Sequence, residues 1–395
     1  MRKRQQKILI LTLMVTLLVP NLCYSEPIKN IDKFSKSSIL IDQDTNRVLF
    51  EKEADTKRPL ASLSKMMTFL LAIEAIENKE VNANDIIVID KSIASVRGSS
   101  YHLKAGEKVP LIELMKGLMI VSGNDAAVAI ARHVGKTDRD FVIRMNKKAK
   151  EIGMSNTNFV NPNGLPIYDL SQPKNPPKEN ISTARDIAIL AKYMFDNYEK
   201  QVVSITDMST YSYPERGFSK NNTNALLGIL PNVDGIKTGY TGNAGYCLSF
   251  SMKIDKDDLN EKEHRIIGVV LGTNHKDKRL STSLSLLKFG KENFATKKVI
   301  DQNQLIGKKY IKGLPELEVV LRADEEFYTI LGKEENLNSQ ITFKEISYPI
   351  KKGDVLGVIK YYTNSGEILG SVDIVSDTDV DNASLKTKIK MIFGD

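Results

Sequence analysis

The residue pattern changes character near residue 295, and no other feature of this 395-residue chain constrains its fold more. Before that point, segments with apolar residues at helical spacing alternate with strand-like runs. After it, short alternating and β-branched runs are separated by turns rich in Gly, Asn and Asp, as in residues 317–322 and 355–362. The sequence therefore predicts an α/β (α+β) domain over residues 26–295 and a small all-β domain over residues 296–380.

Local patterns predict the elements of the first domain. Residues 62–78 place Leu63, Met66 and Leu70 at helical spacing. The predicted helices span 62–78, 111–121, 125–134, 182–195 and 282–289, and the predicted strands lie in 38–51, 245–251 and 265–272. Residues 167–180 contain three prolines and predict a loop.

The N-terminus has the pattern of a secretory signal peptide over residues 1–25. Basic residues at Arg2, Lys3 and Arg4 precede an apolar run over residues 8–19, and Ser25 is a small residue at the expected cleavage point. The run is shorter than the roughly 20 residues that a membrane span needs. We therefore expect an exported protein. An uncleaved anchor is the alternative.

Charge and cysteine usage exclude several function classes. The chain carries 56 basic and 49 acidic side chains, and removal of residues 1–25 leaves 52 against 49. This weak positive balance gives no indication of nucleic-acid binding.

Cys247 is the only cysteine after residue 25, and its apolar neighbours predict a buried thiol. The four histidines are scattered, so we predict no metal and no cofactor.

Three short motifs occur in order along the first domain: Ser62-Leu-Ser-Lys65, Ser122-Gly-Asn124 and Lys237-Thr-Gly239. The first two patterns recur elsewhere in the chain, whereas K-T-G occurs once. An ordered set of this kind is typical of penicillin-binding proteins and β-lactamases. The order is therefore a stronger signal than any single motif.

The first motif has a physical rationale in helix geometry. Residues three apart share a helix face, so Lys65 can reach the Ser62 hydroxyl. A serine hydroxyl becomes a good nucleophile when a base removes its proton, and lysine is a base only when neutral. The alternative for Ser62 is a helix N-cap.

The other two motifs carry groups that suit a peptide substrate. A hydroxyl at Ser122 and an amide at Asn124 can relay a proton and hold Lys65, although Asn124 or Asp125 could instead cap a helix. Lys237 and Thr238 suit a carboxylate, and Gly239 allows a substrate backbone to lie close. A surface turn over residues 234–239 is the alternative.

Beyond these motifs, the sequence resembles the low-molecular-mass penicillin-binding proteins of the D-alanyl-D-alanine carboxypeptidase family, serine peptidases with a β-lactamase-like, transpeptidase-like fold. The resemblance covers residues 30–295, including stretches 59–68, 161–165, 182–186, 222–224 and 233–241. It implies three catalytic residues, Ser62 (nucleophile), Lys65 (base) and Ser122, and six substrate-binding residues, Asn124, Lys237, Thr238, Gly239, Tyr240 and Arg279. The backbone N–H groups of Ser62 and Tyr240 are the implied oxyanion hole. Asn163 departs from the family, because many relatives have histidine there.

The implied reaction removes the terminal D-alanine from peptidoglycan stem pentapeptides through a Ser62 acyl-enzyme, with β-lactams as covalent inhibitors. A D,D-endopeptidase and a non-catalytic wall-binding scaffold are the alternatives. A class A β-lactamase is disfavoured because position 123 is glycine and not aspartate. The implied location is the cell envelope, at the outer face of the cytoplasmic membrane, which is the periplasm if the source is Gram-negative.

The C-terminal segment of residues 381–395 has an amphipathic pattern. Leu385, Ile389 and Phe393 fall on one helix face, and Lys386 and Lys388 add positive charge. We predict that it docks on a membrane surface without crossing it. A tail helix packed on the all-β domain is the alternative.

Overall fold

The computed structural model describes residues 31–311, 314–344 and 349–380. The predicted signal peptide and the predicted amphipathic tail lie outside these residues. Within them, no helix is long and apolar enough to cross a membrane.

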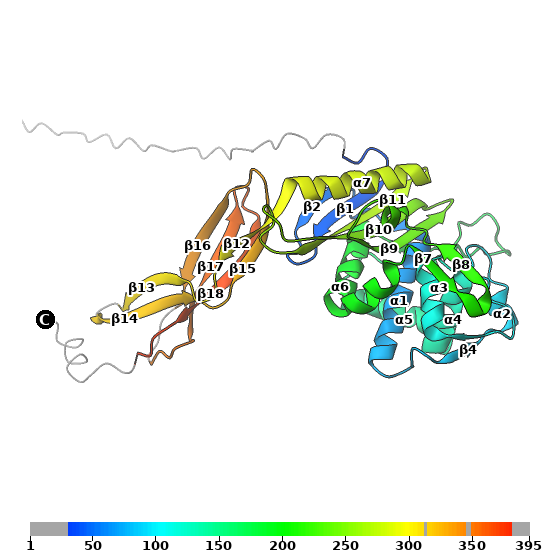
Figure 1. Ribbon diagram of the computed structural model, residues 1–395, viewed down its shortest axis with the longest axis horizontal. Coiled ribbons are helices and arrows are strands. Elements are labelled where there is room, and N and C mark those ends of the chain that lie inside the picture. The colour runs from blue at the N-terminus through cyan, green and yellow to red at the C-terminus, as the bar shows by residue number, and fades with distance from the viewer. Residues whose placement is uncertain (1–30, 312–313, 345–348, 381–395) are drawn as a thin grey trace, which may run out of the picture. The chain divides into compact units, whose positions relative to one another are not determined.

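A five-stranded antiparallel sheet forms the centre of the first domain (Figure 1). Its strands run in the order β2 (Val48–Lys52), β1 (Ser37–Asp42), β11 (His264–Thr273), β10 (Gly245–Ile254) and β9 (Val233–Thr241). The strands predicted in residues 38–51, 245–251 and 265–272 are confirmed, and the first of these ranges forms the hairpin of β1 and β2. The alternative of a surface turn over residues 234–239 is wrong, because seven of the nine residues of β9 are buried in the sheet.

Helices cover both faces of this sheet. The helix α6 (Ala184–Thr206) packs on one face and α7 (Lys276–Asn293) on the other. Every residue of β11 is buried. Ile267 and Val269 enter the core on the α6 side, whereas Ile266 and Val270 enter the core on the α7 side. Alternate residues of a strand point to opposite faces, so a strand covered on both sides needs apolar residues at successive positions, as β11 has from Ile266 to Leu271.

The remaining helices are η1 (Ala61–Ser64), α1 (Lys65–Glu77), α2 (Lys91–Ala94), α3 (Leu111–Met119), α4 (Asn124–Gly135) and α5 (Asp138–Glu151), with the short turns η2 (Pro214–Arg216) and η3 (Ala225–Gly228) later in the chain. The helices α1 to α5 share the core on the α6 side and position the first two motifs, whereas Leu226 of the later turn η3 packs in the core on the α7 side. Three two-stranded ribbons pair β3 (Arg58–Pro59) with β6 (Ile181–Ser182), β4 (Ile86–Val88) with β5 (Lys108–Pro110), and β7 (Thr210–Tyr213) with β8 (Phe218–Asn221).

Several helix boundaries differ from the predictions. The predicted helix 62–78 is divided into η1 and α1, so Ser62 lies in a 3-10 turn whose N-cap is Leu60. The N-cap interpretation of Ser62 is therefore wrong. Thr183 does cap α6, because its side chain accepts a hydrogen bond from the N–H of Asp186. The helix α5 was not predicted, since only Phe141, Met145 and Ala149 of its charge-rich sequence are buried.

The residues after Asn293 form β-strands, which confirms the predicted fold class. A ribbon pairs β12 (Phe294–Ile300) with β15 (Phe327–Gly332). A five-stranded sheet has the order β13 (Leu305–Ile311), β14 (Leu314–Ala323), β18 (Ile368–Ser376), β17 (Val355–Thr363) and β16 (Leu337–Phe343). Val319, Ile359, Val372 and Ile374 contribute to its separate apolar core.

Candidate active site

The first motif brings a lysine amine to a serine hydroxyl. Ser62 lies in η1 and Lys65 begins α1, and Lys65 Nζ lies 2.8 Å from Ser62 Oγ. The predicted reach of Lys65 to Ser62 is therefore confirmed. The lysine side chain is fully buried. Burial, together with the positive charge of Lys237, lowers the pKa of Lys65 well below its ordinary value, while Asp125 opposes this effect.

Two carbonyl oxygens complete the surroundings of Lys65. Its Nζ lies 2.7 Å from Asn124 Oδ1 and 2.7 Å from the backbone oxygen of Asn163. The amide of Asn124 has one possible orientation, because its Nδ2 donates to the backbone oxygen of Arg97 at 2.8 Å. Both oxygens can only accept hydrogen bonds, so they hold the amine in a fixed place.

The second motif leads into α4, whose first residue is Asn124. Ser122 is 5% exposed and has a left-handed backbone (φ 64°), a strained conformation that occurs often at functional sites. Gly123 is the N-cap of α4 without any side-chain capping bond, so the capping interpretation of Asn124 and Asp125 is wrong. A Cβ on Gly123 would lie 2.8 Å from Asp125 Oδ1 and 2.9 Å from Tyr101 Cβ, which explains the glycine at this position.

The third motif lies in the buried part of β9. Lys237 is 1% exposed and its Nζ donates to the backbone oxygen of Thr238 at 3.0 Å. Burial, and then the charge of Arg279, lower the pKa of Lys237 to about 7. Thr238 Oγ1 donates to Thr223 Oγ1 at 2.7 Å. Thr223 was not among the predicted site residues, and its only signal was its place in the stretch 222–224.

Two glycines place β9 and a distant loop against the backbone of η1. A Cβ on Gly239 would lie 3.1 Å from the oxygen of Leu60 and 3.2 Å from the nitrogen of Ser62. A Cβ on Gly164 would lie 1.9 Å from the oxygen of Ala61. The contact of Gly164 is therefore possible only without a side chain, and a Cβ on Gly239 would crowd the backbone of η1. The two glycines lie close to the segment that carries Ser62.

The last two predicted residues lie around the end of β9. Tyr240 is 56% exposed, and its ring lies against that of Tyr246 with centroids 4.2 Å apart and the planes tilted by 30°. The guanidinium of Arg279 contacts the backbone oxygen of Cys247 at 3.4 Å. Burial lowers the pKa of Arg279. Cys247 is fully buried, as predicted, and burial raises the pKa of its thiol to about 11.

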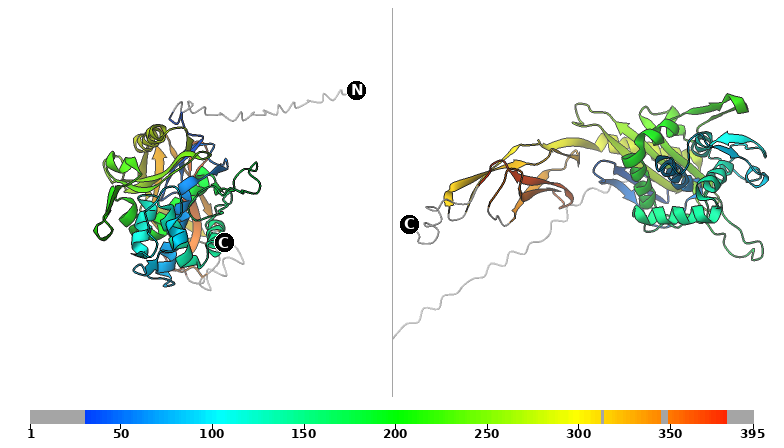
Figure 2. Two further views of the ribbon diagram at one scale, coloured as in Figure 1. Left: turned by 90° about the vertical axis from the view of Figure 1, so that its right-hand side faces the viewer. Right: turned by 90° about the horizontal axis from the view of Figure 1, so that it is seen from below.

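The loop after Leu165 extends from the helices beside this region (Figure 2). Ile167 and Lys178 pair as an isolated antiparallel bridge at its base. Its stem meets the β9–β10 turn, where Asn243 Nδ2 donates to Glu179 Oε2 at 2.9 Å. The loop prediction for residues 167–180 is confirmed. In the part of the chain that the structure describes, no group of three His, Cys, Asp or Glu side chains is arranged to hold a metal ion.

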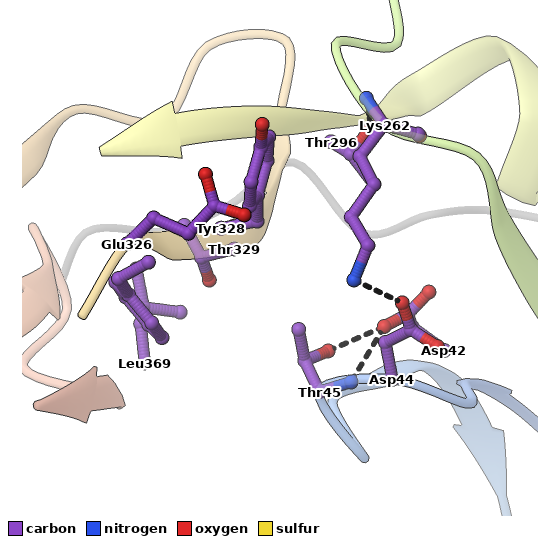
Figure 3. Close-up of a pocket in the computed structure, with 10 residues that line it drawn as sticks. Asp42, Asp44, Thr45, Lys262, Thr296, Glu326, Tyr328, Thr329 and Leu369 are labelled. Carbon is purple, nitrogen blue, oxygen red and sulfur yellow. Dashed lines mark hydrogen bonds and ion pairs between the residues drawn. The ribbon is translucent and has the colours of Figure 1, made fainter. Parts of the chain in front are cut away.

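A cavity lies away from the motifs. It has a volume of about 380 Å³ and contains the ion pair of Lys262 with Asp44 at 3.1 Å (Figure 3). Thr45 donates to Asp42 at its wall. None of the predicted site residues lines it, so the chemistry of the three motifs belongs to the region around Ser62.

Comparison with known proteins agrees with this geometry. Residues 25–275 match the family model described as D-alanyl-D-alanine carboxypeptidase. Residues 294–382 match the model described as penicillin-binding protein 5, C-terminal domain. The resemblance drawn from the motifs is therefore confirmed, and it extends into the β-rich domain.

Individual relatives cover nearly the whole chain. The D-alanyl-D-alanine carboxypeptidase DacF of Bacillus subtilis is 34% identical over 371 residues, 91% of this chain and 90% of its own length. The crystal structure of penicillin binding protein 5 from Haemophilus influenzae has a TM-score of 0.72 and 27% identity, and the match covers 88% of this chain and 98% of that chain.

A cefotaxime-bound structure of penicillin-binding protein D2 from Listeria monocytogenes matches at a TM-score of 0.57 with 28% identity, over 65% of this chain and 97% of that chain. The family comprises penicillin-binding proteins of the cell envelope. Family model, relative and fold identify the same family. The chain therefore belongs to the D-alanyl-D-alanine carboxypeptidase family and is a serine-type, penicillin-binding enzyme of the bacterial cell wall.

Proposed function

We propose that Ser62 is the nucleophile of this carboxypeptidase. Its Oγ attacks the carbonyl carbon of the penultimate D-alanine, and the terminal D-alanine leaves as a free amino acid. Water then hydrolyses the Ser62 ester and releases the shortened stem peptide. The observation that carries this assignment is the 2.8 Å contact between Ser62 Oγ and the buried amine of Lys65.

Lys65 is the general base for the attack. A neutral amine has two N–H groups and one lone pair. Asn124 Oδ1 and the oxygen of Asn163 can only accept, so they take the two N–H groups. The lone pair is then directed at Ser62 Oγ, the third neighbour of the amine. The lowered pKa supplies the neutral form that this step needs.

Lys237, Thr238 and Arg279 bind the terminal carboxylate of the substrate. Lys237 and Arg279 are close enough for the charge of one to lower the pKa of the other. A site with two neighbouring cations and few acids favours an anionic ligand. The hydroxyl of Thr238 adds a hydrogen-bonding group from the same strand.

The N–H groups of Ser62 and Tyr240 stabilise the oxyanion. The close approach of Gly239 to the nitrogen of Ser62 supports this role, because it places the end of β9 against η1. Ser122 passes the proton from the base toward the leaving amine, and its position two residues before Asn124 supports this role.

The test uses a fluorescent penicillin. We expect covalent labelling of the wild-type chain, mapped to the peptide containing Ser62, and no labelling of Ser62→Ala with an unchanged circular dichroism spectrum. Label on another serine contradicts the assignment. Comparison of a pentapeptide with a crosslinked dimer as substrates then separates carboxypeptidase from endopeptidase activity, and we expect faster cleavage of the pentapeptide.

The family implies peptidoglycan peptides as substrates and β-lactams as ligands. We further propose residues 1–25 as a signal peptide, 26–295 as the catalytic domain and 296–380 as the β-rich domain, a division that the end of α7 at Asn293 supports. We also propose that residues 381–395 dock on the outer face of the cytoplasmic membrane. Removal of residues 383–395 should release the protein from membranes in low salt. Equal solubility of the chains with and without these residues contradicts the docking.

A further inference from the structure

Two buried asparagines lie beside the segment that supplies the carbonyl of Asn163 to Lys65. Asn161 is 9% exposed and Asn180 is 1% exposed. We propose that the side-chain amides of Asn161 and Asn180 form a positioning pair, which aims the backbone carbonyl of Asn163 at Lys65 and so sets the direction of the base's lone pair. This inference rests on the proposed role of Lys65 as general base.

The amide of Asn161 organises the backbone on both sides of Asn163. Its Oδ1 accepts from the N–H of Asn163 at 3.2 Å and from the N–H of Gly164 at 2.7 Å. Its Nδ2 donates to the oxygen of Leu165 at 2.7 Å. One side chain thus binds three successive residues, and these bonds fix the peptide plane that carries the Asn163 oxygen.

The amide of Asn180 holds Asn161 in turn. Its Oδ1 accepts from the N–H of Val160 at 2.6 Å and from the N–H of Asn161 at 3.1 Å, and its Nδ2 donates to the oxygen of Asn161 at 2.9 Å. The backbone oxygen of Asn180 also accepts from the N–H of Leu60 at 3.0 Å. Asn180 therefore contacts both the carbonyl-bearing segment and the residues that lead into Ser62.

The two segments also meet through Thr68 and Gly164. Thr68 Oγ1 on α1 donates to the oxygen of Pro162 at 2.7 Å, and Gly164 packs without room for a Cβ against Ala61. These two contacts fix where the segment lies against α1 and η1, and the amides of Asn161 and Asn180 orient the Asn163 carbonyl within it. The side chain of Asn163 is not part of this contact, so a substitution at position 163 does not remove it.

Loss of the pair changes the chemical step more than binding. Without the Asn163 oxygen in place, an N–H of the neutral amine is free to turn toward Ser62 Oγ and the lone pair points elsewhere. A misplacement of about 1 Å at a reacting group can cost about 10²-fold in rate. Among the described residues, the side-chain hydrogen bonds of Lys237, Thr238 and Arg279 go to Thr238, Thr223 and Cys247, and not to the pair.

The test separates the acylation rate constant from the dissociation constant of the preceding complex, using a chromogenic β-lactam and the full chain. For Asn180→Ala we expect an acylation rate constant lowered by about 10- to 100-fold and a dissociation constant within about threefold of wild type. The deficit should persist as pH rises, because the base is misdirected and not protonated. An unchanged rate constant, a change in the dissociation constant alone, or recovery at alkaline pH would overturn the proposal.

Asn260→Ala is the matched control. Asn260 is 4% exposed, and its amide also binds backbone and side chain, at Thr296 and Asp257, but away from the site. We expect its acylation rate constant to stay within about twofold of wild type at a similar loss of thermal stability. If Asn180→Ala does not fold, the same measurements on Asn180→Asp test the proposal. This variant keeps the side-chain oxygen that accepts from the N–H of Val160 and loses the N–H group that donates to the oxygen of Asn161. Full activity of Lys65→Arg, in contrast, contradicts the role of Lys65 itself and not the pair.

Discussion

Arg279 should control the pH range over which the enzyme binds its substrate's carboxylate. Burial and then the charge of Arg279 lower the pKa of Lys237 from 10.5 to about 7, and burial is the larger cause. Arg279 thus accounts for less than half of the lowering of the Lys237 pKa. In Arg279→Gln we expect the pKa of Lys237 to rise, but to no more than about 9.

The sign of the effect follows from the charge of the ammonium group. Lys237 binds a carboxylate when protonated, so affinity is full below its pKa and decreases above it. With a pKa of about 7, the wild-type affinity should fall about tenfold between pH 6 and pH 8, which corresponds to about 1.4 kcal/mol. In Arg279→Gln the affinity at pH 6 is lower, because one cation is lost, but its decrease toward pH 8 is smaller.

The assay is isothermal calorimetry of a D-Ala-D-Ala-terminated peptide in the Ser62→Ala background, in which no turnover occurs. The amide-terminated peptide is the control and should show no such pH dependence. An equal pH dependence for both peptides, or an unchanged midpoint in Arg279→Gln, would refute the electrostatic coupling between Arg279 and Lys237.

Three further changes test other parts of the site. Lys65→Arg keeps the charge but cannot act as a base at neutral pH, and should lower the acylation rate by about 10²–10⁴-fold in a stopped-flow β-lactam assay. Lys237→Ala should reduce turnover of a free-acid peptide more than that of its amide, and equal losses would remove its carboxylate role. Gly164→Ala should cost about 3 kcal/mol or more of unfolding free energy, because its Cβ meets the oxygen of Ala61 at 1.9 Å with φ +85°. Gly153→Ala, with φ +88° and open space, should cost only about 1–2 kcal/mol in the same denaturant titration.

The sequence was sufficient to predict those site contacts that depend on local geometry. The spacing of Ser62 and Lys65 places both on one side of a helical turn, and the structure has their polar atoms 2.8 Å apart. The change of pattern near residue 295 likewise predicted the α/β and β-rich domains. In both cases the prediction depends only on residues that are close together in the sequence, either at helical spacing or in strand-like runs.

Contacts between distant segments had no comparable signal. The base contacts a backbone oxygen at Asn163, and a backbone oxygen is present at every residue. Thr223 meets Thr238 only because the strand β9 and the segment after β8 lie together in the fold. The helix α5 buries only three residues, and so short an apolar face does not stand out in a charge-rich sequence. These features arise from tertiary packing, which local patterns do not encode.

The glycines on either side of η1 also bear on how this enzyme can adapt. A Cβ on Gly164 would overlap the backbone of Ala61, and a Cβ on Gly239 would crowd the backbone of Leu60 and Ser62, so most substitutions there should be removed by selection before they alter specificity. Tyr240 is 56% exposed, and the loop between Ile167 and Lys178 is joined to the domain only at its base. Both can vary without moving the nucleophile. Under selection by a new β-lactam, tolerated mutations should therefore accumulate at Tyr240 and in this loop, while the backbone around Ser62 stays the same.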